Sequence, residues 1–342
     1  MSNVPNSAGK AAGLAELRAE LQEAGIDWGA VSKVLPDWAE TAYESKAGRL
    51  ELRGFVQRHL GLTKGDGGRL SQLKLPAARF KTRSNTSPDQ VASARAAATA
   101  CARVVAGAIN TEWVGLSSKP DELRELIRGR SKHGWVDLEA LLEFTWASGI
   151  PVLFLPDLPS TGHKMEGMVT FAKGRPVVVL TKKASECDWM LFILAHELGH
   201  VALKHLEETE GQAIVDDTVE DSDSNDAQEK EANGFATKLL SSQGKLKIGA
   251  AVPKAPALAA MALDFGQKHG ISPGHVILNV VRHTTIPGFN LFPLGNAALK
   301  CLPENIRGQS PAELCRQAAG KHLDLEKLKN DSVEYLQKLG VI

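Results

Sequence analysis

The chain has few cysteines and no paired cysteine motif. The 342 residues include four cysteines that are far apart in the sequence, with no C-x-x-C pair: Cys101, Cys187, Cys301 and Cys315. This spacing argues against a disulfide framework and against a zinc site made of cysteine ligands. We therefore expect reduced thiols in a cytoplasmic protein.

Long apolar runs are missing as well. The first ten residues have no apolar core of the kind that a signal peptide needs. The longest strongly apolar run, Trp189 to Ala195, is far too short to span a bilayer. The sequence thus predicts no contact with the membrane.

The formal net charge is zero, but the charges are unevenly distributed. Between Arg49 and Arg83 nine Lys and Arg stand against two Asp and Glu, whereas between Glu207 and Glu231 eleven Asp and Glu stand against one Lys. The basic stretch is suited to contact nucleic acid or an acidic partner. The acidic stretch, with Asp216-Asp217 and the run from Glu220 to Asp226 at its centre, is typical of a solvated mobile loop that buries nothing.

The most informative feature is the motif His196-Glu197-Leu198-Gly199-His200 within the helix-like run from Trp189 to Leu206. Residues four apart share one face of an α-helix and lie about 6 Å apart. The two imidazoles can therefore bind one zinc ion, with Glu197 beside a water on the metal, as in zinc-dependent peptidases. Gly199 leaves room for another backbone to pack closely against this helix, with loose packing as the alternative. The alternative is a surface helix with two solvated histidines.

A catalytic zinc ion usually has three protein ligands, so a third is needed. The best source is the helix after the acidic stretch, in Glu229-Lys-Glu-Ala-Asn. Glu231 shares a helical face with Phe235, which should point to the core, and a carboxylate on that face needs a cation to offset its desolvation. We favour Glu231 as the third ligand and keep Glu229 as the second choice. His205 reads as a surface residue or as support for a ligand.

The remaining patterns predict an α+β fold that is mainly helical. Strands are expected at 151–155, 167–172 and 176–180, the last two joined by a hairpin at Lys173-Gly174-Arg175, directly before the helix of the motif. This order gives a zincin-like core with a small antiparallel sheet beside the catalytic helix. The predicted regions are a helical N-terminal region (1–62), a basic linker with an Ala-rich helix (63–118), a metallopeptidase core (119–245) and a helical C-terminal region (246–342).

Two further segments strengthen the motif: Glu229-Lys-Glu-Ala-Asn-Gly-Phe-Ala236 with Leu239-Leu240, and Phe265-Gly-Gln-Lys-His-Gly-Ile-Ser-Pro273. Together with the hairpin and the motif they resemble the ImmA/IrrE metallopeptidases, over roughly residues 120 to 290. Longer members of that family carry an N-terminal helix-turn-helix domain. Residues 14–62 occupy the position of that domain but show no clean helix-turn-helix pattern. A degenerate helix-turn-helix is one interpretation of this region.

The resemblance implies a Zn²⁺ site with ligands His196, His200 and Glu231, and Glu197 as general base. It also implies a protein substrate, namely a repressor-type transcription regulator or an antitoxin-like protein that is cut in a stress or mobile-element response. We expect the substrate to add a strand at the edge of 167–172. His133, His163, His269 and His283 are candidates for a second group that stabilises the oxyanion.

Two other functions remain open. One is a DNA-binding regulator or antitoxin-like protein that keeps the metal site with little proteolysis, using the Arg49–Arg83 stretch or the helix-Gly-helix segment 262–280. The other is an interaction scaffold with a structural zinc ion, although such sites usually have four protein ligands, often cysteines. Glu197 discriminates between these functions, because neither alternative needs a carboxylate there.

Overall fold

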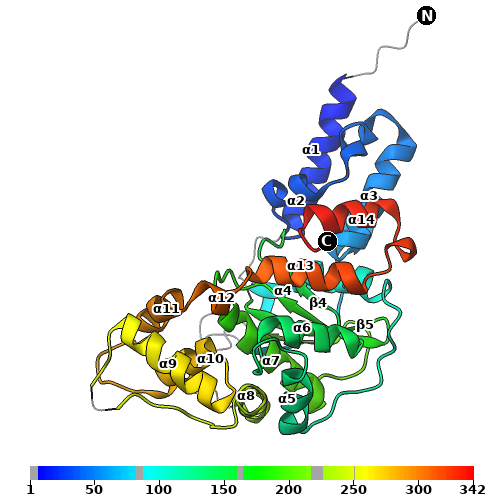
Figure 1. Cartoon of the computed structure of the whole chain (residues 1–342). Helices are drawn as coiled ribbons and strands as arrows, with labels where there is room; N and C mark the ends of the chain where they lie inside the picture. The colour runs from blue at the N-terminus through cyan, green and yellow to red at the C-terminus, as the bar shows by residue number, and fades with distance from the viewer. Residues whose placement is uncertain (1–6, 82–87, 160–164, 217–225, 250) are drawn as a thin grey trace, which may run out of the picture.

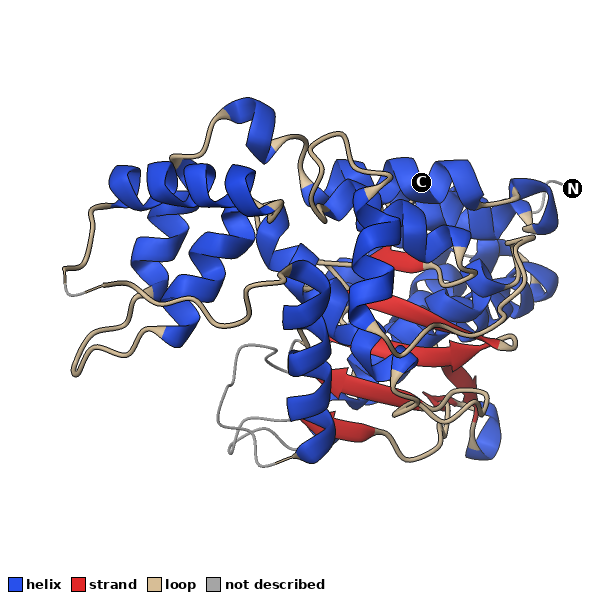
Figure 2. Cartoon of the chain, turned by 60° about the horizontal axis from the view of Figure 1, so that its bottom comes forward, coloured by secondary structure: helices blue, strands red, loops and turns tan. Residues whose placement is uncertain are grey.

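The computed structural model describes residues 7–81, 88–159, 165–216, 226–249 and 251–342. A five-stranded mixed sheet with the order β3-β7-β5-β6-β4 lies at its centre (Figures 1 and 2). The three inner strands are antiparallel, whereas the edge strands β3 and β4 run parallel to β7 and β6. The strands are β3 (Arg79–Lys81), β4 (Val152–Phe154), β5 (Gly167–Ala172), β6 (Arg175–Leu180) and β7 (Ala213–Asp216).

The predicted hairpin is present between β5 and β6. Its turn residues Lys173 and Gly174 have φ angles of 52° and 78°, the left-handed geometry that matches the twist of a two-residue hairpin. However, β5 pairs with β7 on its other side. A substrate cannot add a strand at 167–172, because β5 already has a partner on each side. That prediction was wrong: a hairpin in the sequence does not reveal a third strand more than thirty residues later.

Every residue of β5 is buried. Because successive side chains of a strand point to opposite faces, both faces of the sheet must be covered. Helix α7 (Cys187–Ala202), which carries the motif, and helix α4 (Pro88–Ala106) both pack on β5 and β6. Helix α8 (Ala227–Leu240) packs along α7. A Cβ atom added to Gly199 would lie 3.1 Å from the Cα and carbonyl O of Ala232. Gly199 thus permits the close approach of the two helix backbones, as the sequence predicted.

Three further helices pack beside β4 or against the helix that covers it. These are α5 (Pro120–Arg128), α6 (Leu138–Ala147) and α13 (Pro311–His322). Helix α13 packs on α6 and β4, and α5 packs on α6 and α8. Arg124 donates a hydrogen bond from Nη1 to the Lys238 carbonyl at 2.6 Å, which ties α5 to the end of α8.

The N-terminal helices share a core with the C-terminal end of the chain (Figure 1). The Tyr335 side chain is fully buried and its hydroxyl donates a hydrogen bond to the His59 carbonyl at 2.9 Å. This part contains α1 (Ser7–Glu23), α2 (Trp28–Val34), the 3-10 turns Asp37–Glu40 and Ala42–Glu44, α3 (Lys46–Leu60), the hairpin β1 (Leu62–Lys64) and β2 (Leu70–Gln72) around the turn Asp66–Gly68, the turn Leu325–Lys327 and α14 (Asn330–Lys338). Residues 7–62 are therefore not structurally independent of residues 323–342.

A second apolar cluster lies in the segment between α8 and α13. Helices α9 (Ala255–His269), α10 (Pro273–His283) and α11 (Phe292–Lys300) pack on one another, followed by the short α12 (Glu304–Arg307). Trp189 of α7 packs against this cluster, and α10 contacts α7. The helix-Gly-helix segment 262–280 therefore belongs to a small helical bundle that packs against α7, the helix of the motif.

The predicted α+β class is confirmed, although the sheet is larger than a hairpin and is mixed. The boundary predicted at residue 119 does not follow the core. Helix α4 lies before it, yet its alanines pack inside the main core, among them Ala94, Ala98 and Ala102. The sequence predicted this Ala-rich helix but not its place in the core, because alanine spacing gives little amphipathic contrast. Among the described helices none is long and apolar enough to cross a membrane.

Candidate metal centre

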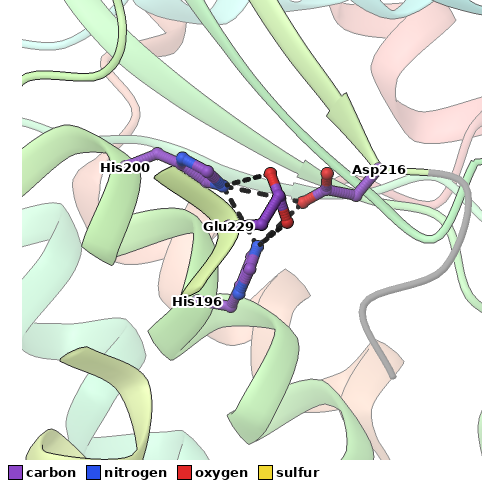
Figure 3. Close-up of side chains that lie close together, drawn as sticks. All are labelled: His196, His200, Asp216 and Glu229. Carbon is purple, nitrogen blue, oxygen red and sulfur yellow. Dashed lines mark hydrogen bonds and ion pairs between the residues drawn. The ribbon is translucent and has the colours of Figure 1, made fainter. Parts of the chain in front are cut away.

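Four buried side chains meet at one point between α7, β7 and α8 (Figure 3). They are His196, His200, Asp216 and Glu229, and their ligand atoms all lie within 4.8 Å of one another. The two Nε2 atoms of the histidines are 3.1 Å apart. Oδ2 of Asp216 lies 3.0 Å from Nε2 of His196 and 3.9 Å from that of His200. Glu229 approaches each histidine with one oxygen, at 3.4 Å.

Each of the three elements has a local reason to place its donor here. The two histidines are one turn apart on α7, so they point to the same side. Asp216 is the last residue of β7 and pairs with Gly167 of β5. Glu229 lies in the first turn of α8, whose start is fixed by Asp226, because its carboxylate accepts a hydrogen bond from the Gln228 N–H at 2.9 Å.

The spacing of these donors fits a tetrahedral ion. Zinc binds histidine nitrogen and carboxylate oxygen at about 2.0–2.2 Å, which gives edges of about 3.3–3.6 Å in a tetrahedron. The separations between a histidine nitrogen and another donor, from 3.0 to 3.9 Å, surround that value, and all four ligand atoms lie within 4.8 Å of one another. The buried carboxylates of Asp216 and Glu229, whose ligand atoms lie within 4.8 Å of each other, also need a cation. Desolvation and mutual repulsion both oppose the charged form of a carboxylate. The residues therefore fit a divalent metal with nitrogen and oxygen ligands.

The electrostatics of the group follow from the same proximity. Burial lowers the pKa of His196, but hydrogen bonds with Asp216 and Glu229 outweigh it and raise the pKa to about 9. Burial raises the pKa of Glu229, yet hydrogen bonds with His196 and His200 bring it well below its usual range. The carboxylates thus favour positive charge at this point, whether it comes from protons or from a metal ion.

Glu197 follows His196 on α7 and is fully buried, but it is not a member of the group of four donors. Its carboxylate lies against the start of β5, and a Cβ atom added to Gly167 would come within 2.2 Å of Oε1 of Glu197. Gly167 is also the β5 residue that pairs with Asp216. The Glu197 carboxylate is therefore held next to the strand that carries one of the four donors.

Residues 147–247 match the model of the peptidase M78 family, described as the IrrE N-terminal-like domain. The chain contains an IrrE N-terminal-like domain. Helix α7, strand β7 and helix α8 all fall within the match, so the domain includes the four donors and Glu197. Neither the curated proteins nor the solved structures gave a match to this chain. The family resemblance predicted from the motif is confirmed.

Within this IrrE N-terminal-like domain the structure corrects the predicted third ligand. Glu229, not Glu231, joins the histidines, while the Glu231 side chain is 61% exposed and bonds to His205. Glu231 was expected on the inner face of α8 because it shares a helical face with Phe235. The buried residues Ala232, Ala236 and Leu240 show that the centre of this face is displaced from Phe235 toward Glu229. Phe235 lies at the edge of that face, and Glu231 lies outside it.

The structure also corrects the prediction for Asp216. The sequence assigned it to a solvated acidic loop, yet it is fully buried at the end of β7. The run Ala213-Ile214-Val215 before it was the available signal for a strand, but a three-residue apolar run is weak beside eleven acidic residues. The other acidic residues named with it, 217 and 220–225, lie outside the described part of the chain.

The ring nitrogens that face away from the centre have partners of their own. Nδ1 of His196 lies 3.2 Å from Oδ1 of Asn233, and that oxygen also accepts a hydrogen bond from Arg282 at 3.3 Å. Nδ1 of His200 lies 3.0 Å from Nδ1 of His205. Nε2 of His205 in turn lies 3.0 Å from Oε2 of Glu231. Partners of this kind fix the tautomer and orientation of metal-binding imidazoles.

His205 reaches His200 because α7 ends before it. Lys204 has a φ of 59°, and the N–H groups of Lys204 and His205 donate to the carbonyls of Val201 and His200. This Schellman turn closes the helix and folds His205 back beside His200. Of the two roles predicted for His205, support for a ligand agrees with the structure and a surface position does not, because its exposed fraction is 7%.

We expect His205→Phe to weaken zinc binding by about 10- to 100-fold, the range typical of lost outer partners of metal-binding histidines. Phenylalanine retains the ring but cannot bond to Nδ1 of His200. Competition with a zinc chelator measures the affinity, and His133→Phe, at an exposed histidine stacked on Trp135, is the matched control. Equal affinities for the two variants would contradict a role of His205.

We expect Gly167→Ala to lower the free energy of unfolding by about 1–3 kcal/mol, since a methyl group there overlaps the Glu197 carboxylate and also meets Ile193 at 3.0 Å. Denaturant unfolding measures the change. Gly234→Ala in α8 is the control: nothing lies within 4 Å of its added Cβ, and helix propensity predicts an unchanged or slightly higher stability. A similar gain in both variants would show that Gly167 has free space.

Three of the histidines proposed as oxyanion partners, His133, His269 and His283, are not members of the described group of four donors, and His163 lies outside the described residues. A second oxyanion donor is therefore not assigned.

Proposed function

We propose that this chain is a zinc-dependent endopeptidase with His196, His200 and Glu229 as metal ligands and Glu197 as general base. The observation that carries the proposal is the buried carboxylate of Glu197, which lies against Gly167, the β5 residue that pairs with Asp216, and is not itself a member of the donor group that fits zinc. A structural metal site does not need such a carboxylate. Two imidazoles with carboxylate oxygen are a ligand set that suits zinc.

Each residue has a distinct chemical task in this proposal. Zinc, when bound, supplies a Lewis acid that polarises a peptide carbonyl and lowers the pKa of water. Glu197 accepts a proton from the attacking water and passes it to the leaving amine. The two imidazoles are oriented by neighbouring side chains. Asn233 lies within hydrogen-bond distance of His196, and His205 lies within that distance of His200. Glu231 in turn holds His205.

We propose a protein substrate of the repressor or antitoxin type, cut at one or few sites. Its support is the IrrE N-terminal-like domain together with the family resemblance of the motif segments. The test is incubation of the zinc-loaded protein with the repressor encoded beside its gene and, separately, with a peptide library, followed by mass spectrometry. We expect cleavage that a chelator abolishes and zinc restores. Absence of cleavage of both substrates by fully loaded protein would contradict the proposal.

DNA binding is less well supported as the primary function. Three arginines of the Arg49–Arg83 stretch form ion pairs with carboxylates of α1 or α14: Arg53 with Glu20, Arg58 with Asp331 and Arg69 with Glu23. Such pairs reduce the positive charge that is available for phosphates. We expect generic duplex DNA to bind weakly, with little dependence on salt. Tight binding that falls steeply with salt concentration would favour the regulator instead.

A further inference from the structure

The four-donor arrangement leaves no corner of a tetrahedron for water. A catalytic zinc site keeps one position open, whereas a closed site uses four protein ligands. On the basis of the proposed function, we propose that Asp216 is a fourth zinc ligand that closes the centre in the resting protein. A substrate carbonyl or an inhibitor must then displace this carboxylate before it can reach the metal.

The side from which Asp216 approaches distinguishes a ligand from an orienting residue. Residues that orient a metal-binding histidine contact the ring nitrogen that faces away from the metal. Here the outward Nδ1 atoms of both histidines contact Asn233 and His205. Asp216 instead contacts the Nε2 atoms, on the same side as Glu229 (Figure 3). Its carboxylate thus lies where a ligand would lie.

The backbone of Asp216 is held firmly in this place. Its strand lies between β3 and β5, and residue 216 is paired on both sides, with Lys81 and with Gly167. The Glu166 N–H also donates a hydrogen bond to the Asp216 carbonyl at 2.7 Å. The sheet therefore fixes the backbone from which the Asp216 carboxylate reaches the histidines.

The surroundings of this carboxylate also call for a cation. It is fully buried, and apart from its contacts with the two histidines no hydrogen bond to its oxygens is found in the described part of the chain. An unsolvated carboxylate is costly unless hydrogen bonds, a counter-ion or a metal offset the loss of water. A direct bond to zinc meets this need.

A carboxylate is a ligand that can be exchanged more readily than a thiolate, and this separates the centre from a permanent structural site. Closure by Asp216 predicts that small zinc-binding inhibitors compete with a protein side chain. It also predicts low activity toward peptides that cannot displace it. The substrate class that fits is a protein whose docking provides enough binding energy to release Asp216.

The test uses the full chain with Co²⁺ in place of zinc, and acetohydroxamate as the probe, followed by visible absorption. We expect Asp216→Asn and Asp216→Ala to bind acetohydroxamate at least ten-fold more tightly than the wild type does, with a changed Co²⁺ spectrum before the probe is added. Glu208→Gln, at an exposed acidic residue of the same stretch, removes the same charge and should behave as the wild type.

Equal affinity for acetohydroxamate in the wild type and both variants would overturn the closed centre. If the variants fail to fold, as judged by circular dichroism, relaxation of water protons by the Co²⁺-loaded wild type decides: a closed centre has no exchangeable water on the metal, and an open one has. These readouts do not depend on peptide cleavage. An active wild type with an open centre refutes only the role of Asp216, whereas a closed centre without cleavage, even in Asp216→Asn, refutes only the peptidase.

Discussion

Glu197→Gln is expected to lower kcat/KM for peptide hydrolysis by about 10²- to 10⁴-fold, the usual contribution of a general acid–base group. The glutamine side chain is nearly isosteric with glutamate and fits the same buried space beside Gly167. It cannot accept a proton at near-neutral pH. Zinc binding should remain unchanged, because Glu197 is not among the four grouped donors.

Two measurements on the same preparation test this expectation. Cleavage is followed by mass spectrometry and metal content by elemental analysis, with Glu208→Gln as a control for the loss of one negative charge. Loss of cleavage with full zinc content supports a role of Glu197 in the chemical step. Retained cleavage would exclude Glu197 as the base, and loss of zinc would instead place it in the metal site.

Glu229→Gln and Glu231→Gln are expected to differ sharply in zinc affinity. Glu229 is 3% exposed and contacts both histidines. Loss of an outer partner of a metal-binding histidine typically lowers metal affinity by about 10- to 100-fold. Glu229→Gln should lower zinc affinity by more than that. Glu231 contacts only His205, and its side chain is 61% exposed. Solvent screens that pair, so we expect Glu231→Gln to weaken zinc binding by less than ten-fold.

The pair of variants forms its own control, because the two substitutions are identical and lie two residues apart on α8. Competition against a chelator gives both affinities, and thermal unfolding of the metal-free proteins shows whether either variant affects the fold. The opposite order, with Glu231→Gln the weaker binder, would mean that Glu231 is the ligand and that α8 is rotated relative to α7 in the metal-bound protein.

Helical spacing accounts for what could be predicted from the sequence. The positions of His196, Glu197 and His200 follow from a four-residue repeat on one helix, and the structure brings the histidines together as that repeat requires. Gly199 and the hairpin at Lys173-Gly174 were also predicted correctly, because each depends on local backbone geometry.

The remaining donors depend on contacts between distant elements. Asp216 is a donor only because β7 inserts between β3 and β5, and no periodicity in the acidic stretch indicates that pairing. The choice between Glu229 and Glu231 depends on the rotation of α8, which the full set of buried residues determines and Phe235 alone does not. The sequence left two roles open for His205, because the left-handed residue that ends α7 is Lys204, where a glycine would have been a clearer signal.

The metal content of the purified full chain tests the central claim most directly. Elemental analysis after zinc loading and desalting should find one zinc ion per chain in the wild type, and X-ray absorption should show imidazole and oxygen ligands with no sulfur. His196→Ala should bind none under the same conditions. A wild-type protein that retains no stoichiometric zinc, or that retains it equally well in His196→Ala, would contradict the account.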